Sequence, residues 1–202
     1  MSQETLKEKL VEACHWIGFK GYFPGSSGNA TIIDREGKQV YITATGRRKT
    51  DLKTTDVIVL DLDGNVVEGK GKPSKEVNFH LRIYRTRKDV AAVIHHHSPF
   101  ATAFAIAGKK LPLLTTPGKL IIRKVPLVEY ASPGSMDLAE LVAKTFSDHS
   151  VKVALLKGHG TVCVGEDIEE AIKISEWLED AAFHAYLSLN LGGIVHLGPA
   201  PS

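Results

Sequence analysis

The sequence is poor in cysteine, and this scarcity excludes one class of protein. Two cysteines among 202 residues cannot build the disulfide framework of a small secreted domain. Cys14 and Cys163 lie far apart without C-x-x-C spacing, so we predict two buried thiols rather than a bond or a redox pair. A chain of this length buries enough surface to support a core without cross-links.

The chain also lacks a strong charge imbalance and any long apolar run. Lys and Arg number 25 against 23 Asp and Glu, and the only dense basic run is Arg47-Arg48-Lys49, which does not resemble a nucleic-acid interface. No apolar run approaches the roughly 18 residues that span a bilayer. The first twenty residues include Glu4, Lys7, Glu8 and Lys9, where a signal peptide would need an apolar stretch. We expect a cytoplasmic protein with no nucleic-acid and no membrane partner.

The sequence contains no internal repeat, low-complexity tract or linker, so we predict a single domain over residues 1–202. Helices are expected at 3–17, 75–87, 99–107, 136–147 and 168–190, with Ser135 and Asp167 as caps of the last two. Strands are expected at 30–33, 40–43, 57–60, 65–67, 91–94, 125–128, 153–156 and 161–164. Asp63-Gly64 is a hairpin signal, and hairpins imply antiparallel pairing. The predicted class is therefore α/β in the α+β sense, with a central, mostly antiparallel sheet flanked by helices.

Nine histidines stand out in this otherwise ordinary composition. An apolar strand runs into His95-His96-His97, and because strand side chains alternate, His95 and His97 point to one face and His96 to the other. Two imidazoles spaced in this way can hold one metal ion. His159 lies between two glycines at the end of another apolar strand and offers a third imidazole.

Three neutral imidazoles leave a coordination position open, which is typical of catalytic rather than structural zinc. The competing interpretation is that each histidine is an ordinary packed residue, and for His159 taken alone that interpretation is the better one. His80 follows Glu76 by four residues on a predicted helix, where packing or orienting is as reasonable as chemistry. The other histidines outside the two motifs, His15, His149, His184 and His196, have no comparable context.

Six ordered motifs with matching spacing resemble the class II aldolase/adducin family over nearly the whole chain. They are Gly25-Ser-Ser-Gly28-Asn29, Ile42-Thr-Ala-Thr45-Gly46, Lys72-Pro-Ser74-Lys-Glu76, His95-x-His97-Ser-Pro, Val125-Pro-Leu-Val-Glu-Tyr130-Ala-Ser-Pro-Gly134-Ser135 and Leu155-Leu-x-x-His159-Gly160. The family's fold, a central antiparallel sheet with flanking helices, agrees with the pattern above. The resemblance also implies a cyclic homotetramer with active sites near the subunit interfaces.

The resemblance assigns roles to particular residues. It implies that His95, His97 and His159 bind one Zn²⁺ per subunit, another divalent metal being an alternative. Glu76 would either complete the metal shell or act as the catalytic acid and base. The substrate phosphate would be bound by Ser27, Gly28, Asn29, Thr45, Gly46 and Ser74, where small residues expose backbone N–H groups to an anion. Many relatives carry a second serine where this chain has Lys75, and a lysine there either binds the anion as a point charge or points outward. Ser74 and Lys75 are expected to open a helix, whose dipole would then face the phosphate.

The implied activity is zinc-dependent cleavage of a phosphorylated ketose, such as an L-fuculose-1-phosphate-like sugar, to dihydroxyacetone phosphate and an aldehyde through an enediolate. A methylthioribulose-1-phosphate dehydratase is the first alternative, because its loops resemble Tyr22–Gly28 and Ile42–Lys49. An L-ribulose-5-phosphate 4-epimerase ranks lower, because residues 113–119 contain no acid. A non-catalytic adducin-like interaction domain is disfavoured by retention of the three histidines and Glu76.

One departure from the family pattern concerns the proton donor to the aldehyde oxygen. The aldolases of the family carry a tyrosine in the stretch corresponding to residues 113–120, given by a neighbouring subunit, and here Thr115 and Thr116 occupy it. A further tyrosine belongs to a longer C-terminal tail. Tyr130 matches a different family position. The sequence therefore leaves the donor and the natural aldehyde open.

Overall fold

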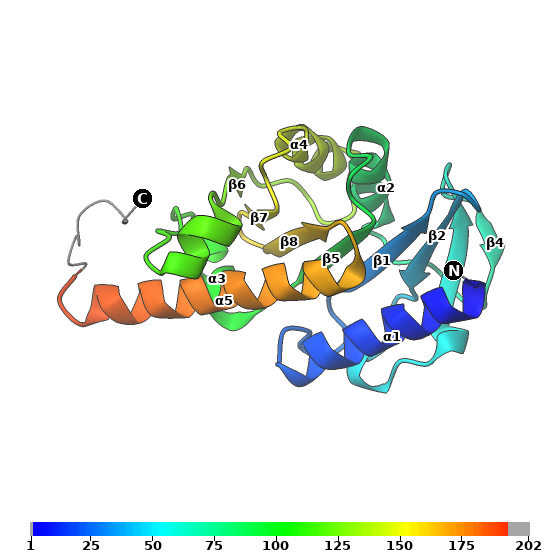
Figure 1. Ribbon diagram of the computed structural model, residues 1–202, viewed down its shortest axis with the longest axis horizontal. Helices are drawn as coiled ribbons and strands as arrows, with labels where there is room; N and C mark the ends of the chain where they lie inside the picture. The colour runs from blue at the N-terminus through cyan, green and yellow to red at the C-terminus, as the bar shows by residue number, and fades with distance from the viewer. Residues whose placement is uncertain (1, 194–202) are drawn as a thin grey trace.

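The chain folds around one eight-stranded sheet with the order β4-β3-β2-β1-β5-β8-β7-β6 (Figure 1). The computed structural model describes residues 2–193, so the ninth histidine, His196, lies outside the described residues. The strands are β1 (Asn29–Asp34), β2 (Gln39–Thr43), β3 (Val57–Asp61), β4 (Val66–Glu68), β5 (Ala92–His96), β6 (Leu127–Val128), β7 (Val153–Leu156) and β8 (Gly160–Gly165). Among these strands of the described chain, only β6 and β7 pair in parallel. The predicted fold class is confirmed.

Helices cover both faces of the sheet (Figure 1). Helices α2 (Val77–Thr86) and α4 (Met136–Phe146) pack on one face through Phe79, Ile83 and Val142. Helices α1 (Gln3–Phe19), α3 (Pro99–Ile106) and α5 (Ile168–Asn190) cover the other. Each helix presents one apolar stripe to the sheet, so most of the stabilisation comes from this burial. None of the helices between residues 2 and 193 is long and apolar enough to cross a membrane.

The predicted helix caps are confirmed, and one predicted helix start is wrong. The Ser135 side chain accepts from Leu138 N, and the Asp167 side chain accepts from Glu170 N. Helix α2 begins at Val77 rather than at residue 75, with Glu76 at the N-cap position. Ser74 Oγ accepts a hydrogen bond from Glu76 N, which keeps this segment as a turn. The two cysteines are buried and unpaired, as predicted, and burial raises the pKa of both thiols to about 12.

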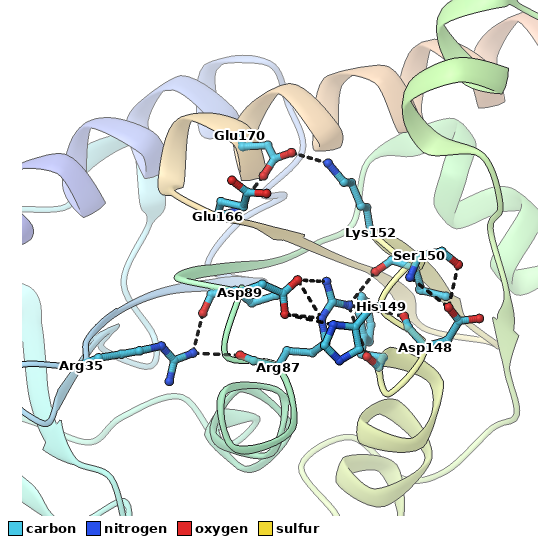
Figure 2. Close-up of polar contacts among 12 residues, drawn as sticks. Arg35, Arg87, Asp89, Asp148, His149, Ser150, Lys152, Glu166 and Glu170 are labelled. Carbon is cyan, nitrogen blue, oxygen red and sulfur yellow. Dashed lines mark hydrogen bonds and ion pairs between the residues drawn. The ribbon is translucent and has the colours of Figure 1, made fainter.

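A buried arginine joins the end of α2 to the turn between α4 and β7 (Figure 2). Arg87 is 3% exposed, and its guanidinium donates to the carbonyls of Phe146 and Val151 at 3.3 and 3.1 Å. It also pairs with Asp89 at 2.6 Å, which lowers the pKa of that carboxyl to about 2. The planar guanidinium thus donates hydrogen bonds to backbone carbonyls in the turn, where no helix or strand supplies an N–H donor.

Replacing Arg87 with methionine is expected to lower the free energy of unfolding by about 2–4 kcal/mol, because buried carbonyls lose their donors. Urea denaturation of the two proteins measures the difference. Arg85→Met is the matched control, since the Arg85 side chain is 57% exposed. A loss of less than about 1 kcal/mol for Arg87→Met would show that water replaces the guanidinium without cost.

Candidate active site

The sheet topology gathers the predicted motifs at one end of the central strands. Asn29 opens β1 and lies opposite His95 near the end of β5, and β1 runs antiparallel to β2, so the loop after β2 lies at the same end. The antiparallel pair β5–β8 places His96 opposite Thr161, next to the turn that carries His159. A bridge between Ala44 and Pro73 adds the segment before Glu76. Segments far apart in the sequence therefore meet at one site.

Three of the histidines form a cluster at this end. The ring centroids of His95 and His97 are 4.7 Å apart, those of His95 and His159 are 4.8 Å apart, and those of His97 and His159 are 5.3 Å apart. One nitrogen from each ring lies within 4.8 Å of the others. His96 points to the opposite face, as the alternation predicts, where it stacks on Tyr22 and contacts Thr161 Oγ1.

Two glycines permit the close approach of chains around this cluster. A Cβ on Gly160 would lie 2.7 Å from the His97 ring and 2.7 Å from His96 O. Gly28 has φ +70°, and a Cβ there would lie 2.7 Å from His95 O and 2.4 Å from the Phe23 ring. A side chain at either position would push the strands or the rings apart. Both glycines are therefore required by the geometry of the cluster.

The Glu76 carboxylate faces the histidine cluster. Oε2 lies 3.1 Å from His95 Nε2, and Oε1 lies 3.3 Å from His159 Nε2. Asn29 Nδ2 donates to Oε2 at 2.9 Å. Burial raises the pKa of this carboxyl, but the adjacent imidazoles of His95 and His159 and the hydrogen bond from Asn29 outweigh burial and lower the pKa to about 2. Glu76 is therefore ionised at neutral pH.

The donor set fits a divalent cation. His95 Nδ1 donates to Thr161 O at 2.8 Å, so in the neutral ring the Nε2 lone pair points at the Glu76 carboxylate. Neither His95 Nε2 nor Glu76 Oε1 has a directed hydrogen bond, although both are buried. A lone pair and a carboxylate at this distance repel each other unless a positive charge lies between them.

The other two rings of the cluster are in the form that binds a metal ion. Burial and the neighbouring His95 lower the pKa of His97 to about 3 and that of His159 to about 4. Both rings are therefore neutral at pH 7, the form in which imidazole binds a metal. Three imidazoles and a carboxylate are a ligand set that zinc accepts.

A cavity of about 240 Å³ opens beside the cluster. Six of the seven residues predicted to bind phosphate line it: Ser27, Gly28, Asn29, Thr45, Ser74 and Lys75. Gly46 follows Thr45 but does not line the cavity. Because Ser74 and Lys75 precede α2, the expectation that they open this helix is wrong, and the α2 dipole acts from two residues farther along the chain.

A chain of buried hydrogen bonds runs from the core to Glu76. Tyr84 Oη and Thr31 Oγ1 are 2.7 Å apart, and Thr31 Oγ1 lies 2.9 Å from His80 Nδ1. His80 Nε2 lies 2.5 Å from Asn29 Oδ1, which directs the Asn29 amide N–H groups toward Glu76 and Ser74. His80 is fully buried and belongs to this chain, in agreement with an orienting role.

This buried histidine makes the protein sensitive to acid. Burial lowers the pKa of His80 to about 3, against an ordinary value of 6.5, so the unfolded chain takes up a proton first as the pH falls. The contribution of neutral, buried His80 to the free energy of unfolding is therefore complete above about pH 6.5 and is lost as the pH falls toward 3. At pH 5 the loss from this residue is about 2 kcal/mol.

We expect His80→Gln to lose less stability than wild type between pH 7 and pH 5 in urea titrations. The exposed His184→Gln, as control, should follow wild type, and equal slopes for all three would contradict the assignment.

The sequence missed three residues of this site. Thr31 and Tyr84 carry no motif, and only their burial on facing elements shows that they support His80. Lys49 lines the cavity, and its signal was the dense basic run that it ends. No tyrosine belongs to the described lining of the cavity, and Tyr130 is 62% exposed beside Gly158.

Comparison with known proteins agrees with this geometry. The family model of the Class II Aldolase and Adducin N-terminal domain matches residues 8–186. The L-fuculose phosphate aldolase of Methanococcus maripaludis is 40% identical over 182 residues, which are 90% of this chain and 97% of that protein. A solved structure of L-fuculose 1-phosphate aldolase superposes with a TM-score of 0.87 at 32% identity, covering 98% of this chain and 92% of that one.

Two further relatives carry other names. The 5-deoxy-D-ribulose 1-phosphate aldolase of Bacillus thuringiensis is 33% identical, over 92% of this chain and 86% of its own length. The methylthioribulose-1-phosphate dehydratase of Cronobacter sakazakii is 30% identical, over 89% of this chain and 93% of its own length. These similarities run through the whole region that holds the histidine cluster and the cavity.

Proposed function

The chain belongs to the class II aldolase and adducin family and is an enzyme of the lyase class, and on this premise we propose its reaction. We propose that it is a zinc-dependent aldolase that cleaves a phosphorylated ketose of the L-fuculose-1-phosphate type to dihydroxyacetone phosphate and an aldehyde. The observation that carries this proposal is the ionised Glu76 beside His95, His97 and His159 at the edge of an anion-sized cavity.

The residues of the site divide the reaction between them. His95, His97 and His159 would hold a divalent ion, which would supply a Lewis acid for the negative charge left beside the carbonyl when the carbon–carbon bond breaks. In the condensation direction the Glu76 carboxylate would remove a proton from the carbon that then carries the negative charge. In the cleavage direction it would return to that carbon the proton that the substrate hydroxyl loses as it becomes the aldehyde. The amide of Asn29 holds one Glu76 oxygen, which orients the other toward His159.

The cavity is proposed as the phosphate site. The backbone N–H of Gly28 and the hydroxyl groups of Ser27, Thr45 and Ser74 offer donors to an anion in the cavity. The lining of the cavity by six of the seven predicted residues supports this assignment. Lys75, although exposed, lies at the same rim.

The second candidate is a methylthioribulose-1-phosphate dehydratase, favoured by 30% identity to a protein of that name. Both reactions begin with a phosphorylated ketose, so the cavity and the histidines serve either. Higher identity to the aldolases favours cleavage. The epimerase ranks below both, and the retained histidines and Glu76 argue against an interaction domain without catalysis.

We further propose a homotetramer with active sites near the subunit interfaces. The cavity's described lining contains no tyrosine to protonate the aldehyde oxygen, so a neighbouring subunit is a reasonable source of the donor. Apolar side chains exposed around α3, η3 (Gly118–Ile122) and the end of α5 support a contact surface there, among them Ile106, Leu120 and Leu191. Sedimentation velocity measures the subunit number.

The reaction is tested by product analysis of the zinc-loaded protein. L-Fuculose-1-phosphate, ribulose-1-phosphate, L-ribulose-5-phosphate and methylthioribulose-1-phosphate are incubated separately, and dihydroxyacetone phosphate is followed by a coupled assay. We expect dihydroxyacetone phosphate from at least one ketose-1-phosphate. Loss of water from the thio-sugar, with no dihydroxyacetone phosphate from any substrate, would replace the aldolase by the dehydratase.

A further inference from the structure

Lys49 is a buried lysine in the wall of the proposed phosphate cavity. It is 1% exposed, although the two arginines before it are exposed. Its side chain lines the cavity together with Ser27, Thr45 and Ser74. A lysine is almost never fully buried unless a partner compensates its charge.

The partners of Lys49 within the protein are neutral. Its Nζ donates to Arg47 O at 2.9 Å and to Ser26 O at 3.4 Å. None of the carboxylates between residues 2 and 193 lies within 4.0 Å of it, whereas nearby Arg47 pairs with Asp56 at 3.1 Å. Two carbonyls satisfy two N–H groups and leave one N–H and the full positive charge without a counter-ion.

Packing of the segment around Lys49 against α1 fixes the position of this residue. His15 Nε2 donates to Leu52 O at 2.8 Å, at the end of the turn η1 (Lys49–Asp51) that Lys49 begins. A Cβ on Gly18 would lie 3.0 Å from Thr50 Cγ2, so η1 packs closely on the helix. The cation is therefore fixed in place before any ligand binds, which removes the entropic cost of ordering a long side chain.

We propose that Lys49 supplies the main positive charge that binds the substrate phosphate. It acts from beneath the cavity, where its hydrogen bonds to Ser26 O and Arg47 O also join the two phosphate loops. No carboxylate of the described residues pairs with Lys49, so a phosphate dianion in the cavity would be its counter-ion. The low local dielectric strengthens the attraction between the two charges. This inference rests on the proposed function, because it takes the cavity to be the phosphate site.

The structure separates Lys49 from the lysine that the sequence favoured for this role. Lys75 is exposed, so water screens its charge and the gain from pairing is small. Lys49 is shielded and preorganised. Lys49 would thereby let the enzyme select a phosphorylated ketose over its unphosphorylated analogue. Within residues 2–193, Lys49 makes no hydrogen bond or ion pair with Glu76 or with the histidine cluster.

The test measures binding of inorganic phosphate by isothermal titration calorimetry, without turnover, to the zinc-loaded protein. Lys49→Met is expected to weaken phosphate binding about 10- to 100-fold, the range of a charge-assisted hydrogen bond. Lys110→Met, which changes an exposed lysine outside the cavity lining, is the matched control and is expected to stay within about threefold of wild type. Lys75→Met is expected to weaken phosphate binding less than Lys49→Met does. With substrate, Lys49→Met should raise KM by a similar factor while kcat changes little, because phosphate contacts bind ground state and transition state alike.

A second variant keeps the result informative if methionine disturbs the loops. Lys49→Gln retains an N–H donor for the loop carbonyls without the charge, and it should weaken phosphate binding as methionine does. Phosphate affinity near the wild-type value in both variants, or an equal loss in Lys75→Met, would overturn the proposal. If wild type cleaves no ketose phosphate, the proposed reaction fails while the phosphate titration still decides the role of Lys49.

Discussion

Replacing Glu76 with glutamine is expected to lower kcat about 10²- to 10⁴-fold, the usual contribution of a positioned acid and base. Glutamine keeps the shape of the side chain and can still accept from Asn29, but it cannot take up a proton. The carboxylate is held ionised beside His95 and His159, which makes it a ready proton acceptor in the condensation direction. Initial-rate kinetics with the ketose phosphate found active measure the change.

The controls for this variant separate chemistry from assembly of the site. Glu129→Gln changes an exposed glutamate that pairs with Lys157, and it should leave kcat unchanged. Metal analysis should find the same ion content in wild type and in Glu76→Gln to within about a factor of two, because the histidines carry most of the binding. Wild-type kcat in a metal-loaded Glu76→Gln protein would remove Glu76 from the proton transfer.

Replacing His95 with alanine is expected to have the larger effect on the metal. The ring lies at the base of the cluster, fully buried, with Nδ1 fixed by Thr161 O and Nε2 directed at the site. Removing one of three imidazoles, together with the hydrogen bond that orients it, should lower metal affinity by at least 10- to 100-fold. Activity should fall with the metal content, and atomic emission after gel filtration measures the bound ion.

The matched control for His95 is His184, an exposed histidine on α5 that contacts only its own helix among the described residues. His184→Ala should bind metal in the wild-type amount. Treatment of wild type with a chelator should abolish activity, and added zinc should restore it. Stoichiometric metal in His95→Ala would show that His95 is not a ligand.

The sequence predicted the regular elements well because their signals are local. Ser135 and Asp167 cap helices through side chains that reach only three residues along the chain. The alternation that places His95 and His97 opposite His96 follows from strand geometry alone. The start of α2 was misplaced because Ser74 stabilises a turn through its side chain, a competition that helical periodicity does not show.

The supporting residues of the site could not be predicted because their role depends on contacts between distant segments. Thr31 and His80 meet only because β1 and α2 pack together, and Lys49 is buried only because η1 packs on α1. The sequence showed Lys49 as the end of a basic run and Lys75 as a residue beside a motif, and periodicity does not distinguish a buried lysine from an exposed one. The fold buries Lys49 and leaves Lys75 exposed, and this difference in burial is why we assign the main phosphate-binding charge to Lys49.

The most direct test of the proposed reaction needs no knowledge of the natural aldehyde. An aldolase that forms dihydroxyacetone phosphate on cleavage must, in the reverse direction, take a proton from the hydroxymethyl carbon of that compound. The zinc-loaded protein, incubated with dihydroxyacetone phosphate in D₂O and followed by proton NMR, is predicted to replace one hydrogen at that carbon by deuterium. Glu76→Gln should abolish this exchange, and Glu129→Gln should not. No exchange by the zinc-loaded wild type, while dihydroxyacetone phosphate demonstrably binds, would contradict the proposed aldolase activity.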